Sequence, residues 1–87
     1  MLLTPNKIYE EFRSKNVDKS ITIESLITLI ENIDDDNVRK ESIDILNKID
    51  VKHKNVFKIL ENILISDSNE NLRYAATKVI KTKFLNS

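Results

Sequence analysis

The chain has 87 residues, which is enough for one small domain and too few for two. Fourteen Lys and Arg balance fourteen Asp and Glu, so the formal net charge is zero and gives no global attraction to nucleic acid or to an anionic membrane. The absence of cysteine excludes disulfides and thiolate chemistry and favours an intracellular, cytoplasmic protein. Glycine is absent as well, which disfavours phosphate-binding loops and hairpin turns and favours an all-α fold.

The N-terminal part predicts two helices. Thr4 is expected to cap the first, with Pro5 at the first helical position, where the missing N–H costs nothing. Its apolar face is thin, which is typical of a helix that covers one side of a larger core. The second helix is predicted to begin at Thr22, because Ile21 and Leu26 have the spacing of a hydrophobic staple.

Three further helices are predicted after this point. Three adjacent carboxylates, centred on Asp35, interrupt the apolar pattern and are interpreted as a turn and helix cap. The helix that follows is predicted to run to about residue 49, with Ile43 off its apolar stripe. A polar link containing His53 precedes the fourth helix, and Asn69 is expected to cap the fifth.

The predicted helices form an internal repeat. At an offset of about 34 residues, the aliphatic-Arg pair that ends in Arg39 aligns with the pair that ends in Arg73. At an offset of about 30, Ile-Glu-Asn-Ile aligns with Leu-Glu-Asn-Ile. Repeated antiparallel helix pairs are typical of an α-solenoid. We therefore expect one domain over 1–87 with five helices: an N-terminal capping helix (4–16) and two repeats (21–49 and 53–84).

The repeat has a recognisable pattern of residue types. An Asp-x-Asp/Asn turn is followed by an aliphatic-Arg pair, small residues and an aliphatic pair. This pattern resembles the HEAT-like repeat of the phycobilisome-lyase type. The resemblance implies a binding scaffold, and it implies structural roles in joining the repeats for Asp35, Arg39, Asp67, Asn69 and Arg73.

Catalytic chemistry is not predicted. His53 is the only histidine and has no carboxylate pair at metal-ligand spacing, so we expect it to be solvated or to start a helix. The acidic triplet lacks the ligand spacing and the glycine of a calcium loop. A serine nucleophile would need a base and an oxyanion hole that the sequence does not assemble. We therefore expect a protein that is not an enzyme and uses neither metal nor cofactor.

Charge is unevenly distributed along the chain. The segment from residue 24 to 44 is acidic, whereas the last helix is basic. Together with the apolar C-terminal residues, this asymmetry predicts a protein-interaction or scaffold module that binds another protein, binds itself, or is a fragment of a longer helical-repeat protein. Nucleic-acid binding through the basic last helix is the alternative, and membrane binding is not expected. The candidate interface residues are Arg73, Tyr74, Lys78, Lys81, Phe84 and Leu85.

Overall fold

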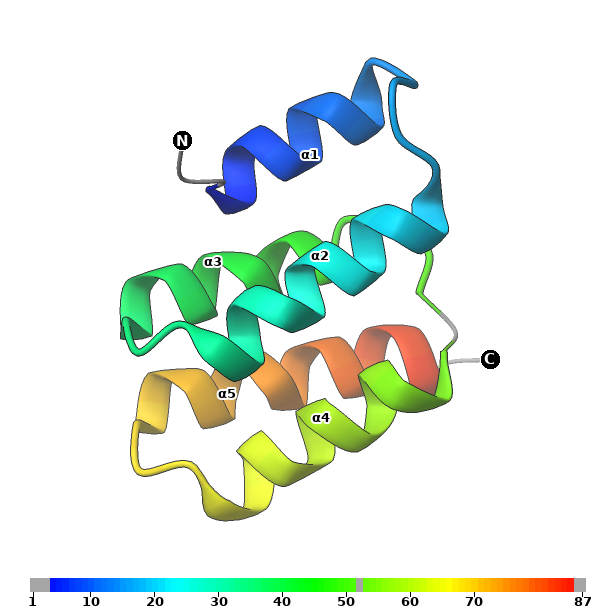
Figure 1. The fold of residues 1–87 in the computed structure, drawn as a ribbon. Helices are drawn as coiled ribbons and strands as arrows, with labels where there is room; N and C mark the ends of the chain where they lie inside the picture. The colour runs from blue at the N-terminus through cyan, green and yellow to red at the C-terminus, as the bar shows by residue number, and fades with distance from the viewer. Residues whose placement is uncertain (1–3, 52, 86–87) are drawn as a thin grey trace.

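The structure is a computed structural model that describes residues 4–51 and 53–85. Five α-helices follow one another along the chain (Figure 1): α1 (Pro5–Arg13), α2 (Lys19–Asn32), α3 (Asp36–Leu46), α4 (Lys54–Ser66) and α5 (Glu70–Val79). A π-helical segment, η1 (Ile80–Leu85), extends α5. Because every regular element in these ranges is a helix, the predicted all-α fold is confirmed. No helix of the described ranges combines the length and the apolar character that a membrane crossing requires.

The helices form two layers (Figure 1). Helices α2 and α4 are neighbours in one layer, and α3 and α5 are neighbours in the other. Along the chain, α2 and α3 form one antiparallel pair, and α4 and α5 form a second. Helix α1 packs on α2 and α3 and covers the side of the first pair that faces away from the second pair. The Cα extents of 34 × 32 × 16 Å agree with a body that is two helices thick.

The core lies between the two layers and holds side chains from all five α-helices. The prediction that Ile43 lies off the apolar stripe of its helix, away from the core, is wrong, because this residue is 0% exposed. Helix α3 contacts α1, α2 and α5, so it buries a wider arc than a single apolar stripe provides. Val51 is also fully buried, although it lies in a link predicted to be polar. Fully or almost fully buried aliphatic side chains include Leu26, Ile43, Ile45, Leu46, Ile49, Val51, Val56, Leu60, Leu72 and Val79.

Three predicted caps are confirmed. The Thr4 hydroxyl accepts a hydrogen bond from the Lys7 backbone N–H at the start of α1. Asp35 caps α3 by accepting from two backbone N–H groups, at 2.9 and 3.2 Å. Asn69 caps α5 in the same way, at 2.8 and 3.2 Å. These side chains satisfy N–H groups that have no partner within the helix, which is why short polar residues fix these starts from the sequence alone.

The connection between α1 and α2 differs from the prediction. Helix α1 ends at Arg13, and Lys15 adopts φ 62°, which turns the chain before residue 16. Asp18 rather than Thr22 caps α2, because its carboxylate accepts from the Ile21 N–H at 2.9 Å. Thr22 lies one turn inside the helix, fully buried, and its hydroxyl donates to the Asp18 carbonyl. The predicted staple is therefore wrong, and the Ile21 side chain is half exposed.

Replacing Asp18 by alanine is expected to lower the free energy of unfolding by about 1 kcal/mol, because the α2 N-terminus loses its side-chain acceptor. Urea unfolding followed by circular dichroism measures this loss. Ser20→Ala is the matched control, since Ser20 is exposed in the first turn of α2 and does not cap it. Equal stabilities of the two variants would contradict the assignment of Asp18 as the cap.

Candidate binding surface

A polar network connects the two helix pairs at the ends where their turns lie. Arg39 on α3 donates to the Asp67 carboxylate in the α4–α5 turn and, at 3.2 Å, to Asp36. Asn69 donates its side-chain N–H to Asp36 at 2.8 Å, so each helix pair donates a hydrogen bond to the other. Arg73 donates to the backbone carbonyl of Asp67 at 2.6 Å. We refer to Asp36, Arg39, Asp67, Asn69 and Arg73 as the inter-pair network.

The electrostatics of the network centre on Asp67. Burial acts to raise the pKa of its carboxyl group, but the Asn69 N–H bond, the Arg39 hydrogen bond and the charges of Arg39 and Arg73 outweigh burial and hold that pKa below its usual value. The carboxylate therefore stays charged at neutral pH. Since Asp67 and Arg39 have side chains only 10% and 20% exposed, the pair is screened less than a surface ion pair.

Four of the five residues predicted to join the repeats belong to this network. Asp35 does not, because both bonds of its side chain go to the N-terminus of its own helix. Its neighbour Asp36 contacts Arg39 and Asn69 instead, and it is the residue that sequence reasoning missed. The spacing of Asp36 and Arg39, three residues apart on one helix, was the available signal.

The two helix pairs differ in what covers them. Arg39 and Ile43 lie one turn apart on the side of α3 that faces the second pair, where Arg39 has a carboxylate partner and Ile43 is fully buried. The equivalent residues at an offset of 34 are Arg73 and Thr77 on α5. Both are half-buried, and within the described residues Arg73 forms no ion pair. The second pair covers the Arg39 and Ile43 side of the first pair. Within the described residues, no element covers the Arg73 and Thr77 side of the second pair in the same way.

Apolar side chains of α4 and η1 extend the same side of the molecule. Ile59 faces α2, and Phe57 and Leu64 lie 200° and 140° from it around the helix, which directs them away from α2. The rings of Phe57 and Phe84 contact edge to face, with centroids 5.2 Å apart. We call the surface formed by Phe57, Leu64, Arg73, Thr77 and Phe84 the end face.

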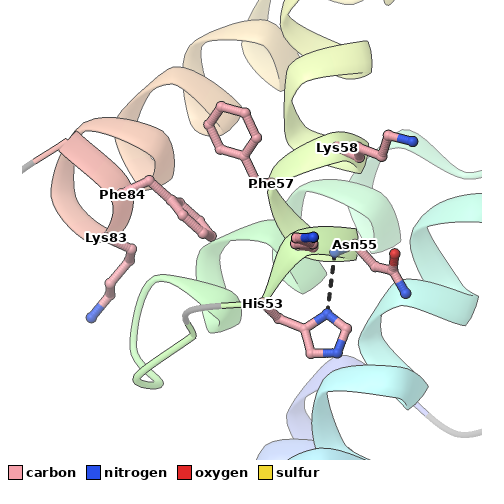
Figure 2. A pocket seen from close by; sticks show the side chains of 7 residues that line it. His53, Asn55, Phe57, Lys58, Lys83 and Phe84 are labelled. Carbon is pink, nitrogen blue, oxygen red and sulfur yellow. Dashed lines mark hydrogen bonds between the residues drawn. The ribbon is translucent and has the colours of Figure 1, made fainter.

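A cleft opens beside the end face, between the start of α4 and η1 (Figure 2). Its volume is about 700 Å³. Phe57 and Phe84 form its apolar wall, and lysines from both elements line its edges. In Figure 2 the side chains of Lys58 and Lys83 extend in opposite directions, away from the aromatic pair. The lining residues are His53, Lys54, Asn55, Phe57, Lys58, Lys83 and Phe84, and none of these carries a carboxylate. We call this feature the basic cleft.

His53 has a structural role in this region. It is the N-cap of α4, and its Nδ1 atom accepts a hydrogen bond from the Asn55 backbone N–H at 3.2 Å, drawn as a dashed line in Figure 2. Of the two alternatives that the sequence left open, the helix-start position is confirmed. In residues 4–51 and 53–85, no group of three His, Asp or Glu side chains is arranged to hold a metal ion.

The structure distributes the predicted interface residues over different surfaces. Arg73 and Phe84 lie on the end face. Tyr74 and Lys78 instead line a groove between α3 and α5, where Tyr74 is 72% exposed. Lys81 is exposed on η1, as is Leu85, which is 68% exposed. Lys54, Lys58 and Lys83 were not predicted, because only the packing of η1 on α4 brings residues 54 and 83 to one cleft.

Comparisons with protein-family models, curated proteins and solved structures gave no match to this chain.

Proposed function

We propose that this chain is a non-catalytic protein-interaction module, built as a short HEAT-like solenoid of two helix pairs with α1 as its N-terminal cap, and that it docks a partner protein on the end face. One observation carries the proposal: the Arg39 and Ile43 side of the first pair is covered by the second pair, whereas the equivalent Arg73 and Thr77 side of the second pair is not. Stacked repeats bury each unit against the next, so an open terminal face with aromatic side chains is suited to binding.

The end face has the composition of a protein-binding surface. Phe57 and Phe84 provide aromatic area, and Arg73 provides a planar donor of which one Nη atom is bonded to a backbone carbonyl. Aromatic residues and arginine are enriched among the residues that contribute most to protein association. Helix α1 already covers the opposite end of the two-layer body, so the end face is the side on which a further helix or peptide extends the stack.

Nucleic-acid binding is the second candidate function. The three lysines of the basic cleft favour it, because phosphate groups bind to clustered ammonium groups. The residues first predicted to bind nucleic acid support this function less well. Arg73 donates a hydrogen bond to the Asp67 carbonyl, and Lys78 lies in the separate groove between α3 and α5.

A selection of random displayed peptides against the immobilised chain tests the proposed function. We expect enriched peptides whose affinity falls about tenfold or more on the Leu64→Ser, Phe84→Ser double variant, because the loss of two apolar contacts removes about 1.4 kcal/mol or more of binding free energy. Circular dichroism would check that the variant keeps its helicity. Ile65→Ser is the control, as Ile65 is an exposed aliphatic residue of α4 outside the end face. Peptides that bind the wild type and the double variant equally, or no enrichment at all, would refute docking at this face.

A further inference from the structure

The basic cleft contains a charge arrangement that does not serve the stability of the fold. Lys54 and Lys58 lie four residues apart at the start of α4, where two like charges repel each other. The N-terminal end of a helix also carries a partial positive charge, so cations there are disfavoured. Lys83 on η1 adds a third ammonium group to the same cleft.

No carboxylate of the described chain lines the cleft itself, although Lys58 also borders a second groove, on the α2 side, that contains Glu24 and Glu31. Within residues 4–51 and 53–85, none of the three lysines forms an ion pair. The exposed surface of α3 differs, because Lys40 pairs with Asp44 one turn away at 2.9 Å. Positions that break local rules without a gain in stability are expected at functional sites. Since none of the described carboxylates lines the cleft itself, the cleft can receive an anion from another molecule.

The geometry of the two aromatic rings indicates the chemistry of the occupant. The planes of Phe57 and Phe84 are 60° apart, so the two rings form an apolar wall and cannot sandwich a flat base between parallel faces. A carboxylate next to an apolar side chain fits this wall and the lysines that line the cleft better than a nucleotide does.

We propose that the basic cleft binds an acidic peptide segment of a partner protein. One apolar side chain of the segment packs against Phe57 and Phe84, and carboxylates on either side of it face Lys54, Lys58 and Lys83. The inference rests on the proposed function, since it names the partner of the end face. A volume of about 700 Å³ accommodates one large side chain and the backbone on both sides of it.

Fluorescence anisotropy tests the inference with a labelled peptide in which several glutamates flank one leucine, and with a second peptide in which lysines replace the glutamates. We expect only the acidic peptide to bind, and we expect its affinity to fall as salt is raised. The Lys58→Glu, Lys83→Glu double variant should bind it at least about tenfold more weakly. The Lys78→Glu, Lys81→Glu double variant is the matched control, because both are exposed lysines that do not line the cleft and the net charge changes equally; the affinity of this variant should stay within about twofold of the wild type.

Stability separates a binding role of these lysines from a structural one. None of the three lysines forms an ion pair within the described residues, so the melting temperature of the Lys58→Glu, Lys83→Glu variant should stay close to that of the wild type while binding is lost. A lower melting temperature together with weaker binding would overturn the inference, because the lysines would then support the fold. Equal loss of affinity in the Lys78→Glu, Lys81→Glu variant would overturn it as well, since the effect would then follow from net charge alone.

Two further outcomes would indicate that the basic cleft binds something other than an acidic peptide, and they would also overturn the inference. One is tighter binding of labelled oligothymidine than of the acidic peptide at the same salt concentration. The other is a wild-type dimer in light scattering that becomes a monomer in the Lys58→Glu, Lys83→Glu variant, which would assign the cleft to a second copy. Failure of the inference differs from failure of the proposed function: displayed peptides that bind at Leu64 and Phe84 but carry no acidic residues would leave the proposed interaction module intact.

Discussion

Replacing Ile43 by alanine is expected to lower the free energy of unfolding by about 3 kcal/mol. The side chain is 0% exposed and lies where α3 packs on the second helix pair, so its removal leaves a cavity that two packed layers cannot close. A domain of this size has a total stability of only about 5–15 kcal/mol. The melting temperature should therefore fall by about 15 °C, which calorimetry or thermal circular dichroism measures.

Ile21→Ala is the matched control for this prediction. Ile21 is also an isoleucine in a helix, but its side chain is 52% exposed, so its truncation should cost less than about 0.5 kcal/mol. Similar losses in the two variants would mean that α3 does not bury Ile43 against the second pair. The comparison also tests the helix packing directly, because the spacing of apolar residues in the sequence gives the opposite ranking of these two positions.

Replacing Asp67 by asparagine is expected to cost about 2 kcal/mol at neutral pH. The substitution keeps the size of the side chain but leaves the Arg39 guanidinium, which is only 20% exposed, without its principal counter-charge. Adding Arg39→Met should recover part of the loss, since no uncompensated charge then remains. Chemical unfolding of the two single variants and the double variant measures this coupling. Asp34→Asn is the control, because Asp34 is an exposed acid outside the network.

The effect of Asp67→Asn on stability should depend on pH. The pKa of Asp67 is lowered in the folded protein, so the stability that its ionised form contributes is complete above the ordinary carboxyl pKa of 3.8. That contribution decreases as the pH falls from there and is lost below the folded-state pKa. The stability difference between wild type and Asp67→Asn should be constant from about pH 5 to 7 and should shrink below about pH 4. A difference that persists unchanged at about pH 2 would exclude the ionised carboxylate as its cause.

Local signals in the sequence predicted the helices well where a cap was unambiguous. Thr4 with Pro5, Asp35 and Asn69 each precede an apolar pattern of helical period, and each caps a helix in the structure. The start of α2 was predicted wrongly because the sequence offers Asp18 and Thr22, two capping residues one turn apart. Packing decides between them, since Thr22 is fully buried in the folded chain.

The sequence by itself determined the all-α class and the main helices, because helix caps and apolar spacing act within a few residues of one another. The predicted repeat also placed Arg39 and Arg73 at equivalent positions. Only the tertiary structure decided which of these arginines meets a carboxylate, that Ile43 is buried, and that Lys54, Lys58 and Lys83 surround one cleft. These features depend on contacts between α3, α4, α5 and η1, and no local pattern encodes the distance between residues that lie far apart in the chain.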